Sequence, residues 1–182
     1  MANGKKKGNK GEREVAKFWK DWSGLEFSRV PASGGLRWQK KDDISGDVIC
    51  TDERKSRRFP FSIESKSYKD INFEHIILGN KNPKVLSFWA QAKGDGERSN
   101  RFPILFIRYN GMAKQTWFVV VTLKVFKQIR LLKPGKFIHS YFTIKTPEDS
   151  FIIMNSDDLQ DLNYTEFIIK IKRLLRNGLK KR

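Results

Sequence analysis

The chain has 182 residues, with 37 Lys and Arg against 20 Asp and Glu, which gives a formal net charge of +17. So much positive charge on a chain of one-domain length predicts a polyanionic partner, most simply nucleic acid. One Cys and two His exclude a disulfide scaffold, a four-cysteine zinc site and most histidine-based metal sites. Because the first ten residues contain no apolar run and no window approaches about 20 apolar residues, we expect a cytoplasmic protein without a membrane partner.

The first half of the chain is predicted to contain one helix and three strands, preceded by a solvated basic arm at residues 1–10. The helix is predicted over residues 11–22, where four apolar residues recur at positions i, i+3, i+4 and i+7 and form one stripe. The strands are predicted over residues 25–30, 47–51 and 59–67, with a loop over 31–46 and a charged turn over 52–58.

The second half alternates helices and strands. Helices are predicted over residues 84–93, 123–131 and 165–179, with strands over 102–109, 115–123 and 137–144, a polar loop over 94–101 and a turn at Asn110-Gly111. Residues 68–83 show no pattern that can be assigned. A strand, a helix and a strand over residues 59–109 are typical of a right-handed parallel crossover. The expected fold is therefore an α/β sandwich with a mixed central sheet.

Two charged residues interrupt the strand predicted over residues 59–67. Glu64 and Lys66 are two positions apart and share one face of a strand, where burial is costly unless something pairs with them. Asp47 opens the apolar strand before it. A divalent metal held by Asp47 and Glu64 would neutralise both carboxylates and leave Lys66 to orient or deprotonate a water. On spacing alone, a salt-bridged strand edge remains the commoner explanation, because Glu-x-Lys arises often by chance.

Phosphodiester hydrolysis would use such an arrangement. Hard oxygen ligands suit Mg²⁺, for which Mn²⁺ can substitute, and Mg²⁺ keeps several waters for the reaction. The metal would lower the pKa of a water and clamp the scissile phosphate, and a lysine would add positive charge.

Four motifs in order give the chain a more specific resemblance. They are Gly11-Glu-Arg-Glu14-Val, Phe27-Ser-Arg29-Val-Pro-Ala-Ser33-Gly-Gly, Gly46-Asp47-Val-Ile and Ile63-Glu64-Ser-Lys66-Ser. Together they resemble the archaeal-type Holliday junction resolvases of the PD-(D/E)XK nuclease superfamily, over about residues 8–110. The resemblance implies a restriction-endonuclease-like α/β core and a Mg²⁺-dependent endonuclease acting on branched DNA, preferably four-way junctions. It also implies a homodimer, because two symmetric cuts need two active sites.

The resemblance also implies roles for single residues. Asp47 and Glu64 match the metal carboxylates, and Glu12 matches a helix glutamate that helps to hold the metal shell. Lys66 matches the lysine that positions the nucleophilic water. Phosphate contacts are implied for a second set, which comprises Arg13, Arg29 and the mobile-loop residue Ser33. The implied catalytic set is Glu12, Ser33, Asp47, Glu64 and Lys66.

The chain also departs from the family pattern. Gly46 stands where the family has a proline before its metal aspartate, and Asp42 and Asp43 compete with Asp47 for that role. We prefer Asp47, because it directly begins a predicted buried strand. No counterpart in the family aligns with the region after about residue 125. We therefore expect three parts: the arm at residues 1–10, a nuclease core at 11–125, and an extension at 126–182 that packs on the core.

Three further features suggest DNA contacts, each with a simpler alternative. The loop residues Arg37, Trp38, Lys40 and Lys41 combine charge with an aromatic ring, which suits phosphate contact and stacking on an unpaired base. The alternative is a solvated loop with Trp38 folded onto the core. Gln91 either contacts the active site or is solvated, and the basic residues after 166 are either a DNA arm or solubilising charge.

Two other functions stay open at this point. One is another PD-(D/E)XK nuclease, restriction-like or flap-type, and the other is a non-catalytic nucleic-acid-binding protein of the same fold. Because the charge supports all three, only the set Glu12, Asp47, Glu64 and Lys66 favours catalysis.

Overall fold

The computed structural model describes residues 2–30, 45–52, 55–69, 71, 73–79, 83–133, 139–147 and 149–179. The helices are α1 (Ala2–Ser23), α2 (Glu74–Ile77), α3 (Lys84–Arg98), α4 (Leu123–Leu132), α5 (Ser156–Gln160) and α6 (Tyr164–Leu179), with a 3₁₀ turn η1 (Ser56–Arg58). The strands are β1 (Phe27–Arg29), β2 (Val48–Cys50), β3 (Phe61–Tyr68), β4 (Phe102–Tyr109), β5 (Phe118–Thr122), β6 (Phe142–Lys145) and β7 (Ser150–Asn155).

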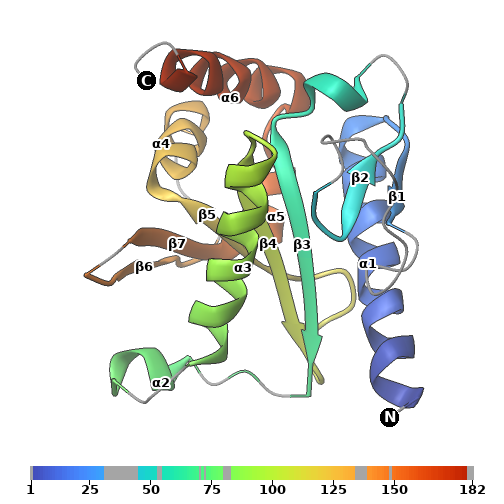
Figure 1. Ribbon diagram of the computed structural model, residues 1–182, viewed down its shortest axis with the longest axis vertical. Coiled ribbons are helices and arrows are strands. Elements are labelled where there is room, and N and C mark those ends of the chain that lie inside the picture. The colour runs from blue at the N-terminus through green and yellow to red at the C-terminus, as the bar shows by residue number, and fades with distance from the viewer. Residues whose placement is uncertain are drawn as a thin grey trace.

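The described strands form one seven-stranded sheet in the order β1-β2-β3-β4-β5-β7-β6. Strands β3 and β4 are parallel and are joined through α3, whereas the other neighbouring pairs are antiparallel. Because α3 lies across the sheet between these two strands (Figure 1), the strand–helix–strand prediction is confirmed. The mixed sheet flanked by helices is the predicted α/β fold.

Most of the core lies on the face of the sheet that α1 covers. The apolar stripe of α1 places Trp19 among aromatic rings from several strands, including Phe27, Phe59 and Phe61, with ring centroids 5.2 to 5.8 Å away. Helices α4 and α6 add their apolar sides to the same cluster. This packing fixes α1 against β1, β2 and β3 and so sets the relative position of those three strands.

Helix α3 covers the opposite face. Its buried residues Val85, Phe88, Trp89 and Ala92 pack on the alternate side chains of β4, β5 and β7. Their spacing of i, i+3, i+4 and i+7 puts these residues on one side of the helix. Strand β3 is thus covered on both faces, and its first five residues are all buried.

The C-terminal elements pack on the rest of the chain. Trp22 Nε1 on α1 donates to the Leu162 carbonyl at 2.9 Å, and the rings of Phe61 and Phe167 stack at 5.8 Å. Strand β7 continues the central sheet beside β5. The division of the chain into three parts stays a prediction.

Two predicted helices are longer than expected, one at its start and one at its end. Helix α1 begins at Ala2, so residues 2–10, expected as a solvated basic arm, belong to the helix. Asn9 in this stretch accepts from Arg29 Nη2 at 3.1 Å. Helix α3 runs to Arg98 through the predicted loop at 94–101. Gly96 is tolerated there because the helix approaches the next strand closely, where a Cβ would lie 2.8 Å from the Arg101 carbonyl.

Some elements were missed or shifted. Strand β7 and helices α2 and α5 were not predicted, and the strand predicted over residues 137–144 is β6, at Phe142–Lys145. The charged turn at 52–58 contains η1. Among the described helices, none is both long and apolar enough to cross a membrane.

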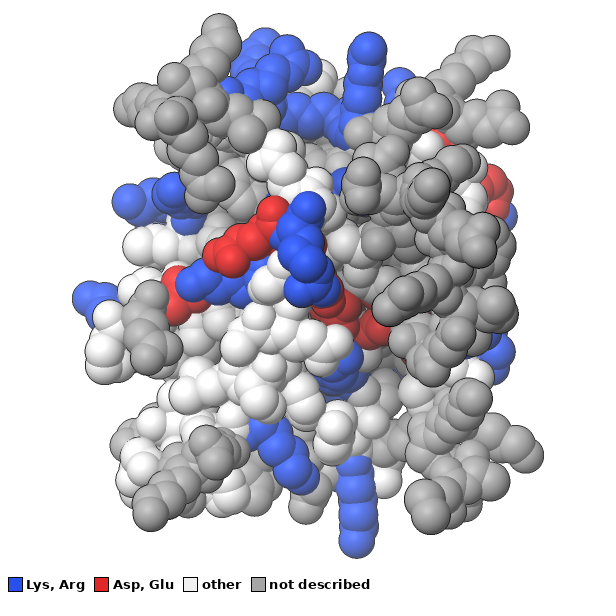
Figure 2. Space-filling model, in the orientation of Figure 1, with Lys and Arg blue, Asp and Glu red and all other residues white. Residues whose placement is uncertain are grey.

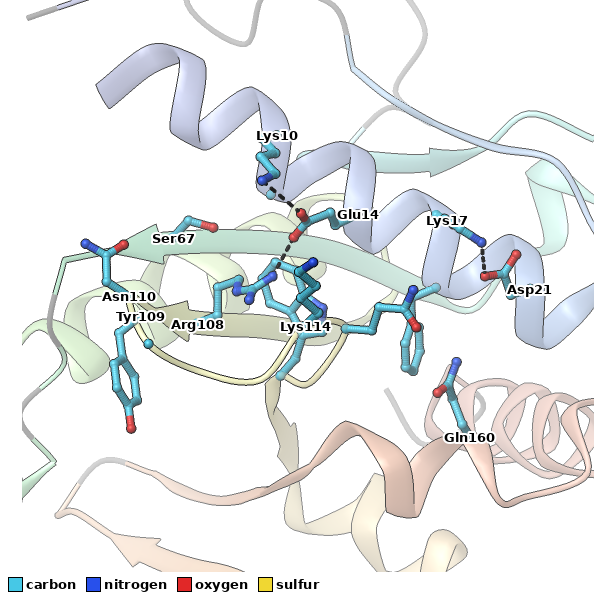
Figure 3. A pocket seen from close by; sticks show the side chains of 15 residues that line it. Lys10, Glu14, Lys17, Asp21, Ser67, Arg108, Tyr109, Asn110, Lys114 and Gln160 are labelled. Atoms are coloured by element: carbon cyan, nitrogen blue, oxygen red, sulfur yellow. Dashed lines mark hydrogen bonds and ion pairs between the residues drawn. The ribbon is translucent and has the colours of Figure 1, made fainter. Parts of the chain in front are cut away.

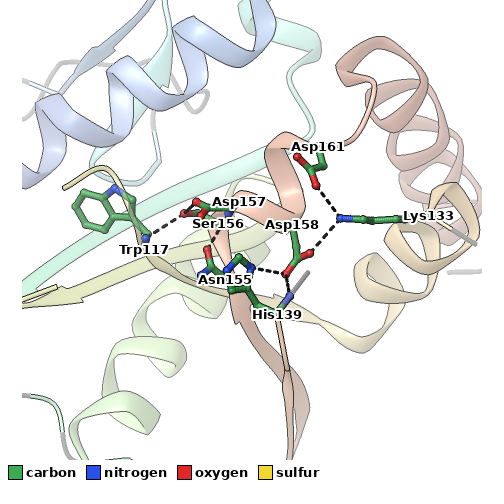
Figure 4. A network of polar contacts seen from close by, with 8 residues as sticks. All are labelled: Trp117, Lys133, His139, Asn155, Ser156, Asp157, Asp158 and Asp161. Carbon is green, nitrogen blue, oxygen red and sulfur yellow. Dashed lines mark hydrogen bonds and ion pairs between the residues drawn. The ribbon is translucent and has the colours of Figure 1, made fainter. Parts of the chain in front are cut away.

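A buried acid, Asp158 on α5, ties down the connection that follows α4. It accepts from Lys133 Nζ at 3.0 Å and from the His139 backbone at 3.1 Å (Figure 4). Lys133 also bonds Asp161 at 3.0 Å. This network fastens both ends of the segment between α4 and β6 to α5.

Candidate active site

Asp47 is held at the start of β2 by the backbone of β3. Its N–H donates to the Ile63 carbonyl at 2.8 Å, and its Oδ2 accepts from the Ser65 N–H at 3.0 Å. The preceding Gly46 has φ +87° and forms a bridge with Ile63. A proline, whose ring holds φ near −65°, cannot adopt this conformation. The positive φ at this position therefore explains why glycine stands here in place of the family's proline.

Glu64 and Lys66 lie on the same face of β3, as predicted. Lys66 Nζ donates to Glu64 Oε2 at 3.0 Å and lies 3.5 Å from Asp47 Oδ2. Glu64 is buried, with 1% of its surface exposed. Two carboxylates and one ammonium group thus meet at one point beside the sheet.

The electrostatics of this group reflect burial and mutual repulsion. Burial and the charge of Asp47, which outweighs that of Lys66, together raise the pKa of Glu64 to about 7. Burial by itself would lower the pKa of Lys66, but Asp47 and Glu64 outweigh it and raise that pKa above its ordinary value. Lys66 is one cation beside two carboxylates, so it compensates their charge only in part.

Helix α3 supplies a fourth side chain to the group. Gln91 Nε2 lies 3.4 Å from Glu64 Oε2 although Gln91 is exposed to solvent, so both alternatives left open for this residue, contact with the site and solvation, apply. The crossover between β3 and β4 brings α3 over the face that holds Glu64. The amide can therefore fix the orientation of the carboxylate.

A protein-family model described as "Phage putative PDDEXK endonuclease" matches residues 3–170, which is most of the chain. The chain belongs to this family. It therefore belongs to the PD-(D/E)XK nuclease superfamily and has the fold that was expected. The predicted membership of the PD-(D/E)XK superfamily is confirmed. The closer resemblance to Holliday junction resolvases stays a prediction.

One curated relative of the chain is Protein D14 of Escherichia phage T5. It is 27% identical over 104 residues, which cover 57% of this chain and 63% of that protein. The match thus spans less than two thirds of the relative's length. No solved structure matches the chain.

Glu12, expected to complete the metal shell, is engaged elsewhere in the structure. Its Oε2 accepts from Arg29 Nε at 2.9 Å, across α1 and β1. Among the described residues, no three acidic, histidine or cysteine side chains are grouped closely enough to hold a metal. The structure thus brings Asp47 and Glu64 together without Glu12, and the metal role of Glu12 stays a prediction.

The remaining predicted contacts divide into two groups. Arg13 is exposed on α1, and Arg29 is partly buried in its pair with Glu12; their phosphate contacts stay predictions. A second group lies outside the described residues, and its roles stay predictions as well. It comprises Ser33, Arg37, Trp38, Lys40 and Lys41, together with the alternative metal residues Asp42 and Asp43.

Sequence reasoning missed a hydroxyl cluster next to the carboxylates. Ser45 Oγ lies 2.9 Å from Ser62 Oγ on β3 and 2.7 Å from Ser99 Oγ just after α3. Ser62 is two residues before Glu64 and shares its face. The cluster anchors the residue that leads into Gly46 and Asp47. The only sequence signal was the polar Ser62 at a buried strand position.

A pocket of about 510 Å³ lies on the other face of the sheet, between α1 and the ends of β3 and β4 (Figure 3). Arg108 Nη1 donates to Glu14 Oε2 at 2.6 Å, and the guanidinium lies over the ring of Trp117 at 5.1 Å. Glu14 is about 200° around the helix from Glu12, which explains their different partners. This pocket contains none of the predicted catalytic residues.

The geometry of Gly46 generates a stability prediction. A Cβ at this position would lie 2.3 Å from the Ile63 carbonyl oxygen, with positive φ in addition. Gly111 also has positive φ, at +91°, but nothing lies within 4 Å of its Cβ position. We expect Gly46→Ala to cost at least about 2 kcal/mol more than Gly111→Ala in urea unfolding, because only the first adds a backbone clash. Equal losses would contradict the close approach.

The raised pKa of Glu64 predicts an unusual pH dependence for the metal-free protein. The folded state keeps a proton on Glu64 up to about pH 7, whereas the unfolded chain releases it near pH 4.5. Stability should therefore fall as pH rises from about 4.5 to 7. In EDTA, the free energy of unfolding of the Glu64→Gln variant should decrease over this pH range by roughly 2 kcal/mol less than that of the wild type.

Thermal melts of both proteins between pH 5 and 8 measure the effect. The variant should be the more stable protein at pH 8, and parallel pH profiles would show that Glu64 is not buried against Asp47.

Proposed function

We propose that the protein is a Mg²⁺-dependent DNA endonuclease that hydrolyses phosphodiesters at four-way junctions and acts as a homodimer. One observation carries the catalytic part of this proposal. Lys66 Nζ lies 3.0 Å from a Glu64 oxygen and 3.5 Å from an Asp47 oxygen although all three side chains are largely buried. Such a costly arrangement is typical of a functional site.

The residues present suit a hard divalent cation. Two carboxylates face each other with a single ammonium group between them, and their repulsion is relieved by a cation. Mg²⁺ commonly uses one or two protein carboxylates and fills its other positions with waters and substrate phosphate oxygens. Asp47 and Glu64 would hold Mg²⁺, or Mn²⁺ in its place, and Glu12 would add to the shell if it left Arg29. When bound, the metal would lower the pKa of a water and stabilise charge on the scissile phosphate.

The protein's own groups have separate tasks. The Ser65 N–H and the Ile63 carbonyl keep Asp47 in place. Lys66 is positioned to orient the attacking water and to place positive charge where negative charge develops on the phosphate. Gln91 donates to Glu64 and holds that carboxylate toward Asp47.

Preference for junctions and a dimeric state are supported by the order of the resolvase-like motifs. The net charge of +17 supports binding to a large DNA substrate. Two identical active sites related by a two-fold axis would account for paired cuts.

Cleavage assays with active-site variants test the catalytic residues. Asp47→Asn and Glu64→Gln should each lower the cleavage rate in Mg²⁺ by at least about a thousandfold, because each removes a charge from the proposed metal site. DNA binding should be unchanged or tighter, because both carboxylates repel phosphates. Glu97→Gln, at an exposed position on α3, is the matched control and should cleave normally. Wild-type rates in either active-site variant would mean that the site is assigned wrongly.

Substrate choice is tested with a labelled four-way junction, a duplex, a flap and a single strand, each with Mg²⁺ or EDTA. Paired symmetric cuts confined to the junction are expected. Cleavage of the duplex or the flap alone would indicate that the protein is another nuclease of the superfamily and not a junction resolvase. Binding without any cleavage would indicate a non-catalytic protein.

A further inference from the structure

Four basic side chains gather where α6 passes η1. Lys172 and Arg176 are one helical turn apart on α6, and Lys55 and Arg58 belong to η1 and its N-terminal flank. We call these four residues the α6–η1 cluster. Figure 2 shows basic side chains along this edge of the molecule, over α6, and Figure 1 shows η1 beside that helix.

Apolar packing fixes the base of the cluster. Phe167, Ile168 and Ile171 on α6 are buried, so the polar side of the helix is turned outward. Lys55, Arg58 and Arg176 are exposed, and Lys172 is half-buried. The cations are therefore held on a firm surface and reach solvent.

The four cations of the cluster have no ion pair with a described acid, whereas some other cations of the chain have one. Lys17, Lys20 and Lys93 each lie within 4.0 Å of a carboxylate. Among the described residues, no such pair exists for Lys55, Arg58, Lys172 or Arg176. The acid beside them, Asp52, accepts the backbone N–H of Lys55.

The four charges act on one another. Burial lowers the pKa of Lys172, and Lys55, Arg176 and Arg58 lower it further by repulsion between like charges. Like charges this close to one another destabilise the surface that carries them. An external polyanion would relieve this repulsion.

The cluster has a defined place relative to the active site, because η1 leads directly into β3. Arg58 is six residues before Glu64 in the chain, which spans about 20 Å at the rise of a strand. A DNA duplex advances about 3.4 Å for each base pair. A duplex arm that ran from a phosphate at Asp47 and Glu64 along β3 toward η1 would therefore reach the cluster after about six base pairs.

We infer that the α6–η1 cluster binds backbone phosphates of a duplex arm, about six base pairs from the scissile phosphate. This inference rests on the proposed DNA endonuclease function. The ligand is the duplex backbone, because cations supply charge to phosphates and carry no sequence readout. The cluster should raise affinity for long arms and leave the chemical step unchanged.

Charge reversal at Lys172→Glu with Arg176→Glu tests the inference, and Lys124→Glu with Lys127→Glu is the matched control. The control pair lies on α4, is exposed and changes the net charge equally. Binding is measured with the non-cleaving Glu64→Gln background, on junctions with 15-base-pair arms and with 4-base-pair arms closed by hairpins. The cluster variant should bind the long-armed junction at least about tenfold more weakly than the control at 0.1 M salt, and its salt slope should be less steep by about two units.

Short arms cannot reach the cluster, so on the short-armed junction the two variants should bind alike. In the cleaving background, the cluster variant should raise KM on long arms and keep kcat. Lys55→Gln with Arg58→Gln should also weaken binding of the long-armed junction. Because this variant leaves α6 unchanged, a loss of binding in it cannot be caused by misfolding of that helix.

Equal binding of long arms by cluster variant and control would overturn the inference. So would an equal loss on long and short arms. Failure of the proposed function is recognised separately, because wild-type protein would then cleave none of these substrates with Mg²⁺, whatever the arm length.

Discussion

The structure depends on one constraint: two carboxylates must sit beside each other at a largely buried position of a sheet. Burial and the charge of Asp47 raise the pKa of Glu64, and the ammonium group of Lys66 offsets this only in part. The backbone keeps them there regardless. Asp47 is bonded through both its N–H and its side chain to β3, so it cannot turn away without breaking the sheet. A divalent cation bound by both carboxylates would relieve this repulsion. The proposed hydrolysis of phosphodiesters uses such a cation.

The surrounding architecture maintains this position. Strand β3 is covered by α1 on one face and approached by α3 on the other, so Glu64 and Lys66 have little room for alternative conformations. The same crossover delivers Gln91 to Glu64. In the α6–η1 cluster, basic charge is left unbalanced by described acids and is free to attract a polyanionic substrate.

Local patterns were enough to predict the parts of the site that lie on one strand. A period of two puts Glu64 and Lys66 on one face, and the apolar stripe of α1 was evident from its spacing. Contacts between distant segments were not predictable. Glu12 pairs with Arg29 because α1 continues along β1, and α3 passes through Gly94 and Gly96 because it packs closely on the segment before β4. Both outcomes depend on tertiary packing, which overrides local propensity.

Anomalous diffraction from crystals of the protein soaked in Mn²⁺ with a short DNA duplex tests the central claim most directly. We expect an anomalous peak at about 2.1 Å from carboxylate oxygens of both Asp47 and Glu64, with Lys66 displaced from between them toward a phosphate. A fully occupied Mn²⁺ site elsewhere on the DNA-bound protein, with Lys66 still bridging the two carboxylates, would contradict the account.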